Sequence, residues 1–192
     1  MIDTLRLLAI SLFQICLFIG HTSPNYGNEL TSEDKPEPGG GVDGHFQRFS
    51  IMTIVVTMCP FYHLIYHSQN SLNLFETFLI LIMILSFSLR MWSYYTLNKF
   101  FTFTLAIKKD HQLIKNGPYQ YLVHPSYTGQ LGMVYTFILF TRFYWMLPIL
   151  GLYTYMLLHK RISIEENMMI NKFGGEYDKY IKERKRFIPF IY

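Results

Sequence analysis

The chain has 192 residues, which is enough for one ordinary domain with a short appendage. It is 51% apolar and 18% aromatic but only 16% charged, whereas about a quarter of a typical soluble domain is charged. This composition excludes disorder for most of the chain and excludes a water-soluble fold with a charged surface. The net charge of +4 does not indicate nucleic acid as a partner, because the basic residues adjoin apolar runs, where Lys and Arg mark the cytosolic flank of membrane spans.

The N-terminal region divides into an apolar segment, 1–20, and a polar one, 21–47. The apolar run 7–19 is as long as the core of a signal peptide and short for a span of ~20 residues, so an anchor helix and a cleaved signal peptide both stay open. The polar segment is rich in Pro, Gly, Ser, Glu and Asp, which predicts a flexible linker. Residues 48–192 are expected to form the membrane domain.

The cysteines and the N-terminal pair of histidines predict no metal or redox site. Cys16 and Cys59 lie in apolar stretches and are interpreted as small buried hydrophobic residues. His63 and His67 have the spacing of one helical face, but no third ligand faces them, so no metal is expected.

Two spans are predicted at the start of the membrane domain, at 49–66 and 72–89. Pro60 is expected to kink the first span. The second begins near Glu76 and is closed by Arg90. Because an acidic side chain is costly in lipid, Glu76 is expected to face the headgroups or the protein interior.

A helical hairpin is predicted from the apolar stretch 128–158, which is interrupted only at Thr141 and Arg142. A single helix of this length would run ~46 Å, longer than the ~30 Å hydrocarbon core. A turn at Arg142 places the basic residues of 98–126 and those after His159 on one side, which is the cytosol by the positive-inside rule. The expected fold is an all-α integral membrane protein with about five transmembrane helices and an external N-terminus.

The C-terminal tail alternates apolar and charged residues at helical spacing. Gly174 and Gly175 are expected to end one helix, and a second short helix follows. This pattern predicts amphipathic helices that lie on the membrane surface.

Two polar segments on the cytosolic side hold the candidate chemistry. The turn signal at 116–118 precedes Pro125, which suits the first position of a helix whose free N–H groups can bind an anionic group. Further along, Arg161 and Glu165 share one helical face. Such a pair on a surface contributes little, but its place at the end of a span favours a role in function, with the planar guanidinium of Arg161 holding a carboxylate.

These segments carry a resemblance to a known family. The run H-x-L-I-x-x-G-P-Y-x-Y-x-x-H-P-S-Y-x-G, then R-x-x-x-E-E, F-G-x-E-Y-x-x-Y and I-P-F, closely resembles the isoprenylcysteine carboxyl methyltransferase family over about 104–192. The resemblance implies an enzyme that uses S-adenosylmethionine to methylate the C-terminal carboxylate of prenylated cysteine in proteins. It also implies a multi-pass protein of the endoplasmic reticulum membrane, with a cytosolic cofactor-binding loop and the active site within 98–192.

The resemblance also implies roles for single residues. Arg161 would bind the carboxylate of the substrate, and Arg161 and Glu165 are the candidate catalytic pair. Glu165 would also contact the cofactor, as would Thr104, His111, Gln112, Leu113, Ile114, Tyr119, His124, Pro125, Ser126 and Tyr127.

Two positions depart from the family pattern. Val123 stands where members usually have Arg, and Lys185 stands where most have Pro. The first departure removes one electrostatic contact, which a neighbouring Lys is expected to replace.

Other functions stay open from the sequence. One is a phospholipid or other amine N-methyltransferase on the same scaffold, although an amine has no need of the cationic anchor Arg161. Another is a sterol reductase that uses NADPH, a family of usually twice this length. Val123 alone suggests a non-catalytic membrane scaffold. The expected partners are the prenylcysteine ends of lipidated proteins and membrane lipids, with no nucleic acid.

Overall fold

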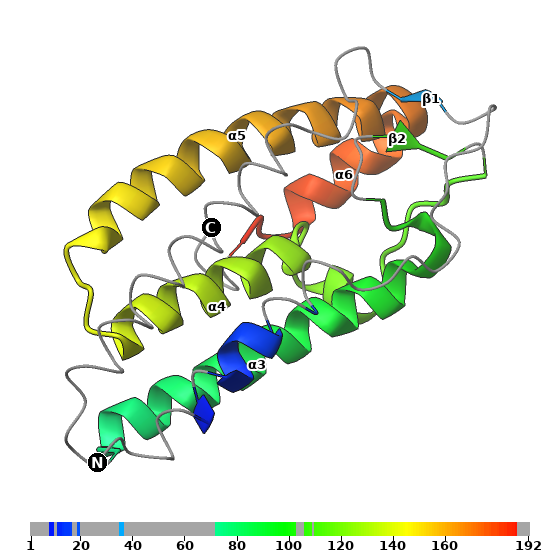
Figure 1. Ribbon diagram of the computed structural model, residues 1–192. Coiled ribbons are helices and arrows are strands. Elements are labelled where there is room, and N and C mark those ends of the chain that lie inside the picture. Colours follow the sequence, from blue (N-terminus) through cyan, green and yellow to red (C-terminus); the bar gives the residue numbers. More distant parts are fainter. Residues whose placement is uncertain are drawn as a thin grey trace.

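The computed structural model describes residues 8–9, 11–16, 19, 35–36, 72–102, 106–108 and 110–187. Three long helices run beside one another, and a short fourth helix folds back at one end (Figure 1). The elements are β1 (Lys35–Pro36), α3 (Leu74–Leu97), the 3-10 helix η1 (Asn98–Phe100), β2 (Ala106–Ile107), the 3-10 helix η2 (Gly117–Gln120), α4 (Pro125–Phe140), α5 (Met146–Phe173) and α6 (Gly175–Glu183).

The described residues leave out much of the N-terminal third. The span predicted at 49–66, with Cys59 and Pro60, lies outside them, and so do His63 and His67. Of the predicted linker, only Lys35–Pro36 is described, as a strand paired antiparallel with β2. Within the N-terminal apolar run, residues 11–16 are helical, and the predicted burial of Cys16 is confirmed.

Helix α3 begins at a capping box. The Asn73 side chain accepts a hydrogen bond from the backbone N–H of Glu76, and the Glu76 carboxylate accepts one from the backbone N–H of Asn73. Glu76 is 2% exposed, so the prediction that it faces the protein interior is confirmed. The predicted end of this helix was wrong, because α3 continues past Arg90 to Leu97 and buries that arginine. Burial is tolerated because the Arg90 guanidinium donates to Ser126 and lies over the Tyr94 ring.

Close contact between α3 and α4 depends on glycine. A Cβ atom on Gly129 would lie 2.6 Å from the Ser86 carbonyl oxygen and 2.9 Å from the Arg90 nitrogen, so a side chain there forces the two backbones apart. Small residues let membrane helices approach in this way. The core that forms here includes Phe137 of α4, whose ring lies 4.5 Å from that of Phe13.

The predicted hairpin at Arg142 is confirmed. Helix α4 ends at Phe140, α5 begins at Met146, and Arg142 in the turn adopts a left-handed backbone with φ of +61°. Across the hairpin the Tyr135 hydroxyl and the Thr154 hydroxyl are hydrogen-bonded at 3.0 Å. The turn lies at the same end as the start of α3 (Figure 1).

Helix α5 runs on from the hairpin into the tail. The sequence predicted a span followed by a separate tail helix, but α5 is one helix of 28 residues that ends at Phe173 and is capped by Gly174. It is about 42 Å long, which exceeds the ~30 Å hydrocarbon core of a bilayer. Arg161 and Glu165 follow Met146 by 15 and 19 residues, or about 22 and 28 Å along the helix axis, so both lie near the far boundary of a core that begins at Met146. The last two turns of α5 extend beyond that boundary.

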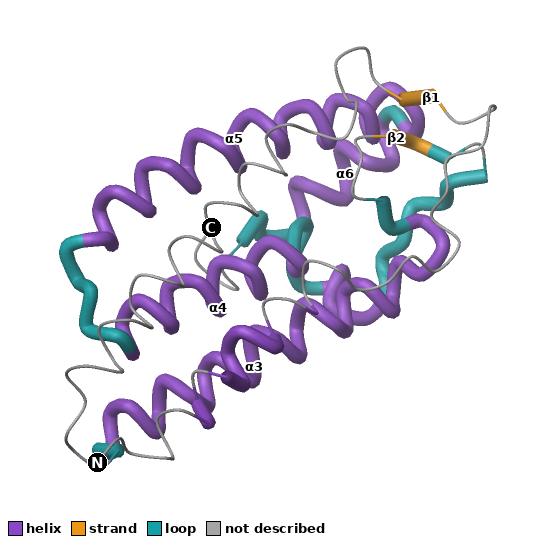
Figure 2. The backbone as a smooth tube through the Cα atoms, viewed as in Figure 1, coloured by secondary structure: helices purple, strands orange, loops and turns teal. Residues whose placement is uncertain are grey.

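The second tail helix, α6, is amphipathic, and its apolar face packs against the rest of the protein. Tyr177 and Tyr180 are each 3% exposed and pack with Val123, Leu113 and Ile181. The predicted amphipathic pattern of α6 is confirmed, and its apolar face is used within the protein; its place on the membrane surface stays a prediction. The loops between α3 and α4 gather where α5 and α6 meet (Figure 2).

One helix among the described residues, spanning Leu74–Phe100, is long and apolar enough to cross a membrane. It exposes large apolar side chains along its length, among them Phe78, Leu81, Leu85 and Trp92. These side chains form a surface that suits contact with lipid.

Candidate active site

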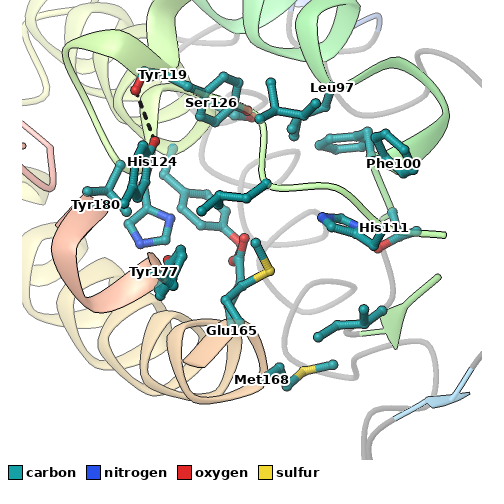
Figure 3. A pocket seen from close by; sticks show the side chains of 18 of the residues that line it. Leu97, Phe100, His111, Tyr119, His124, Ser126, Glu165, Met168, Tyr177 and Tyr180 are labelled. Atoms are coloured by element: carbon teal, nitrogen blue, oxygen red, sulfur yellow. Dashed lines mark hydrogen bonds between the residues drawn. The ribbon is translucent and has the colours of Figure 1, made fainter. Parts of the chain in front are cut away.

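A cavity lies at the end of the bundle where α6 folds back over the α3–α4 loops. It is lined by the end of α3, by η1, by the segments on either side of η2, by the first turn of α4, by the C-terminal part of α5 and by α6. Its walls are mostly aromatic and aliphatic, with a few polar groups that converge on the interior (Figure 3). Such a combination is typical of small-molecule binding sites.

Most of the residues singled out in the sequence meet at this cavity. Those that line it are His111, Leu113, Ile114, Tyr119, His124, Ser126, Tyr127, Arg161 and Glu165. Gln112 is exposed and does not line the cavity, and Pro125 is fully buried behind the wall as the first residue of α4, as predicted. Thr104 lies outside the described residues.

Tyr127 connects the two charged residues of α5. Its hydroxyl oxygen accepts a hydrogen bond from Nε of Arg161 at 2.7 Å and donates one to Oε2 of Glu165 at 2.9 Å. Arg161 is 9% exposed, and all three side chains line the cavity. The helical spacing of Arg161 and Glu165 does aim both at one cavity, and a phenol from α4 bridges them.

Arg90 is a residue of the cavity wall that the sequence did not suggest. Its Nη1 donates to the carbonyl oxygen of Ser126 at 3.1 Å and to the Ser126 hydroxyl at 3.2 Å. These bonds hold the first turn of α4 against α3. In the sequence, an arginine after an apolar run is equally typical of the flank of a membrane span. Its burial depends on the contact with Ser126, which cannot be predicted from the spacing of residues in the sequence.

His111 lies on the side of the cavity opposite α6 (Figure 3). Its ring is 4.9 Å from Phe100 and 6.0 Å from Phe173, measured between centroids. Burial, with the nearby Lys172, lowers its pKa to about 4, so the imidazole is neutral at physiological pH. Its Nδ1 atom is buried and has no hydrogen-bond partner among the described residues. A buried polar atom of this kind is costly unless a ligand or water satisfies it.

Helix α6 closes the cavity from one side. The Tyr180 hydroxyl donates to the carbonyl oxygens of Tyr119, at 3.0 Å, and Leu122, at 3.3 Å, which fixes α6 to the loop (Figure 3). Burial raises the pKa values of the Tyr119 and Tyr180 phenols, so both remain neutral donors. The exposed ion pair between Lys115 and Glu176, at 2.7 Å, joins the same two segments.

A second glutamate of α5 lies behind the cavity wall. Oε1 of Glu166 lies 3.1 Å from Nε2 of His124, and the Arg186 guanidinium binds both carboxylate oxygens at 3.0 Å. Burial by itself would raise the pKa of Glu166, but the hydrogen bonds from His124 and Arg186 outweigh it and lower the pKa to about 2. Glu166 therefore stays ionised throughout the working range of a protein.

The partners of Glu166 are distant in the chain, so sequence reasoning missed this cluster. Glu166 is the second Glu of the quoted R-x-x-x-E-E motif, but the resemblance implied a role only for Glu165. Arg186 belongs to a tail in which basic residues are frequent, so its type carried no signal.

The polar groups of the cavity define what it can bind. The Arg161 guanidinium suits a carboxylate, the Glu165 carboxylate suits an amine or hydroxyl groups, and the aromatic walls suit a planar ring. Within the described part of the chain, no group of three side chains has the arrangement of metal ligands.

Comparison with known proteins agrees with the motifs. Residues 78–171 match the sequence model of the isoprenylcysteine carboxyl methyltransferase family. The chain is 32% identical over 94 residues to a protein-S-isoprenylcysteine O-methyltransferase of Tribolium castaneum, and 31% identical over 93 residues to one of Schizosaccharomyces pombe. Each match covers 43% of this chain, but 29% of the first relative and 35% of the second. The chain thus matches about a third of the length of these curated relatives, and the predicted resemblance to the family is confirmed.

Proposed function

We propose that this chain is an S-adenosylmethionine-dependent methyltransferase that esterifies the C-terminal carboxylate of prenylated cysteine in proteins. The observation that carries the proposal is the cluster Arg161–Tyr127–Glu165 on the wall of a cavity bounded by the loop that contains His124. The family match covers α4 and nearly all of α5, which supply these residues.

The cavity fits S-adenosylmethionine in its chemistry. Glu165 would accept hydrogen bonds from the amine or the ribose hydroxyl groups, the unpartnered Nδ1 of His111 would face a polar atom, and Phe100 and Tyr119 would flank apolar parts. The cofactor, when bound, supplies a methyl group on a sulfonium that is already activated for transfer.

Arg161 would hold the carboxylate that receives the methyl group. Its Nε is fixed by the Tyr127 hydroxyl, so the orientation of the guanidinium plane is set before any ligand arrives. A fixed donor reduces the entropy that is lost when the reacting carboxylate is positioned. Because Tyr127 also donates to Glu165, the substrate and cofactor positions would be held by one connected group of side chains.

The walls would keep water away from the carboxylate. Tyr119, Tyr177 and Tyr180 are each at most 7% exposed and line the cavity on the α6 side. Removing water from a carboxylate strengthens its interactions with fixed donors and favours its reaction as a nucleophile.

The proposed membrane placement follows from the charge pattern, which puts the basic residues of 98–126 and those of the tail on one side. The α4–α5 turn would lie on the external side and the cavity on the cytosolic side of a multi-pass protein, here assigned to the endoplasmic reticulum.

Cysteines introduced at Gln112 and Lys179, in a chain without native cysteines, should react with an impermeant reagent from the cytosolic side. A cysteine at Tyr144, in the turn, should react only from the opposite side, and the reverse pattern would overturn the orientation.

The acceptor distinguishes the proposal from amine methylation. Membranes that contain the chain would be given labelled S-adenosylmethionine with N-acetyl-S-farnesylcysteine or, separately, with phosphatidylethanolamine. A methyl ester releases its label in alkali, whereas an N-methyl group does not. The proposal predicts alkali-labile label on the farnesylcysteine alone, and label that appears only on the lipid would replace it with the amine reaction.

A further inference from the structure

The C-terminal segment 185–187 is fastened to the loop that forms one wall of the cavity. The backbone N–H of Val123 donates to the Lys185 carbonyl oxygen at 2.8 Å, and that of His124 donates to the Arg186 carbonyl oxygen at 3.1 Å. The Thr128 hydroxyl then donates to the carbonyl oxygen of Phe187 at 2.7 Å. Val123 and His124 both line the cavity, so the segment supports its wall from behind.

Glu166 joins this segment to the wall through side chains. One carboxylate oxygen contacts Nε2 of His124 at 3.1 Å, and the same carboxylate binds Arg186 through two parallel hydrogen bonds of 3.0 Å. The side chains of His124 and Glu166 are only 4% and 11% exposed, whereas that of Arg186 is 41% exposed. Glu166 itself does not line the cavity. Because Glu166 is largely buried, losing either of its partners would be costly. Because it does not line the cavity, it can affect a ligand only through those partners.

We propose that Glu166 and Arg186 form a positioning pair that fastens the C-terminal segment to the His124 loop and thereby shapes the cofactor side of the cavity. The inference rests on the proposed function in that the ligand is taken to be the cofactor. Glu166 contacts both Arg186 and the His124 ring, whereas the Arg186 guanidinium acts here through Glu166. Arg186 meets the loop through its backbone carbonyl and brings its guanidinium to Glu166, while the lysine expected to compensate for Val123 stays a prediction.

The first experiment is a double-mutant cycle on binding of S-adenosylhomocysteine to the purified full chain. Glu166→Gln should weaken binding by ~10- to 100-fold and Arg186→Gln by about tenfold, because each removes a charged partner from a largely buried group. The double variant should be no weaker than Glu166→Gln, since the two residues act through one contact. Glu183→Gln is the matched control, because it breaks the exposed pair with Arg184 nearby and should change binding less than about twofold.

The second experiment replaces the pair by a covalent link. Leu122 and Lys185 are partners in a β-bridge, a separation that a disulfide can span. In the Arg186→Gln variant, the Leu122→Cys/Lys185→Cys disulfide should restore affinity to within about threefold of the same cysteine pair in the parent chain. In Glu166→Gln the rescue should be partial, because His124 then faces a neutral amide in place of its charged acceptor.

The outcomes separate this inference from the proposed function. Additive losses in the cycle, a Glu166→Gln effect as small as that of Glu183→Gln, or a disulfide without effect in Arg186→Gln would each overturn the positioning role. If the parent chain bound no S-adenosylhomocysteine, the proposed function would fail instead. The rate at which the two introduced cysteines oxidise would then decide the positioning role. Oxidation should be faster in the chain that keeps Arg186 than in Arg186→Gln, and equal rates would contradict the role.

Discussion

Each end of the helical bundle contains an arginine close to a glutamate, but the two arrangements differ. At the turn end, Arg142 pairs directly with Glu76 at 2.9 Å, and Glu76 is also part of the helix capping box. At the cavity end, Arg161 and Glu165 are bridged by the Tyr127 hydroxyl, and all three line the cavity. The charges of Arg142 and Glu76 are used within the protein and stabilise the fold. The charges of Arg161 and Glu165 line a cavity, where they can bind a ligand.

The largest effect is expected at Arg161. Arg161→Ala should lower methyl transfer to a prenylcysteine by about 30- to 4000-fold, because it removes the charged partner of a desolvated carboxylate. Binding of S-adenosylhomocysteine should persist, since the variant removes a contact to the substrate and none to the cofactor. Arg161→Lys should recover little, because a point charge does not replace a planar fork. If methyl transfer stayed within about twofold of the parent, Arg161 and Glu165 would be a structural pair like Arg142 and Glu76, with no role in the reaction.

Glu165 should affect the cofactor first. Glu165→Gln keeps an oxygen that can accept from Tyr127 but loses the charge, so affinity for S-adenosylhomocysteine should fall by roughly 10- to 100-fold. Calorimetric titration of the purified chain measures this. If the affinity for S-adenosylhomocysteine were unchanged but methyl transfer were slower, Glu165 would act on the substrate and not on the cofactor.

The contact between α3 and α4 should affect stability more than chemistry. Gly129→Ala places a methyl group against backbone atoms of Ser86 and Arg90, and overpacking of this kind typically costs ~1–3 kcal/mol. Gly151→Ala is the matched control, because its Cβ would meet only the Tyr135 hydroxyl at 3.5 Å. Thermal unfolding in detergent should show a lower midpoint for the first variant alone. Equal midpoints would mean that the helices are not in close contact at Gly129.

The smallest effect on the cavity is expected at the turn end. Arg142→Gln removes the ion pair, and although the Arg142 side chain is 54% exposed, its partner Glu76 is 3% exposed, so the loss of unfolding free energy should be about 1–3 kcal/mol. Affinity for S-adenosylhomocysteine should stay within about twofold, since the cavity lies at the other end of the bundle. A larger loss of affinity here than in Glu165→Gln would reverse the comparison between the two ends.

Local signals in the sequence predicted much of the fold. Pro125 marked the start of α4, the polar interruption at Arg142 marked the turn, and Gly174 marked the end of α5. Each of these depends on backbone chemistry within a few residues. The continuation of α3 past Arg90 was not predictable in this way, because a buried arginine is stable there only through Ser126, which lies 36 positions away.

The candidate site was predicted to a similar degree. Motif spacing identified Arg161, Glu165 and the loop that contains His124, because their order in the chain is local. The Glu166–Arg186 pair and the inward face of α6 depend on how the tail folds back, and charge type alone does not distinguish an exposed basic residue from one that holds a buried carboxylate.

Direct binding to the purified full chain tests the central claim, that the cavity beneath α6 holds S-adenosylmethionine. Titration with S-adenosylhomocysteine should give saturable one-to-one binding that weakens in Glu165→Gln and is retained in Arg142→Gln. NADPH should not bind. Tight binding of NADPH with no binding of S-adenosylhomocysteine would contradict the account.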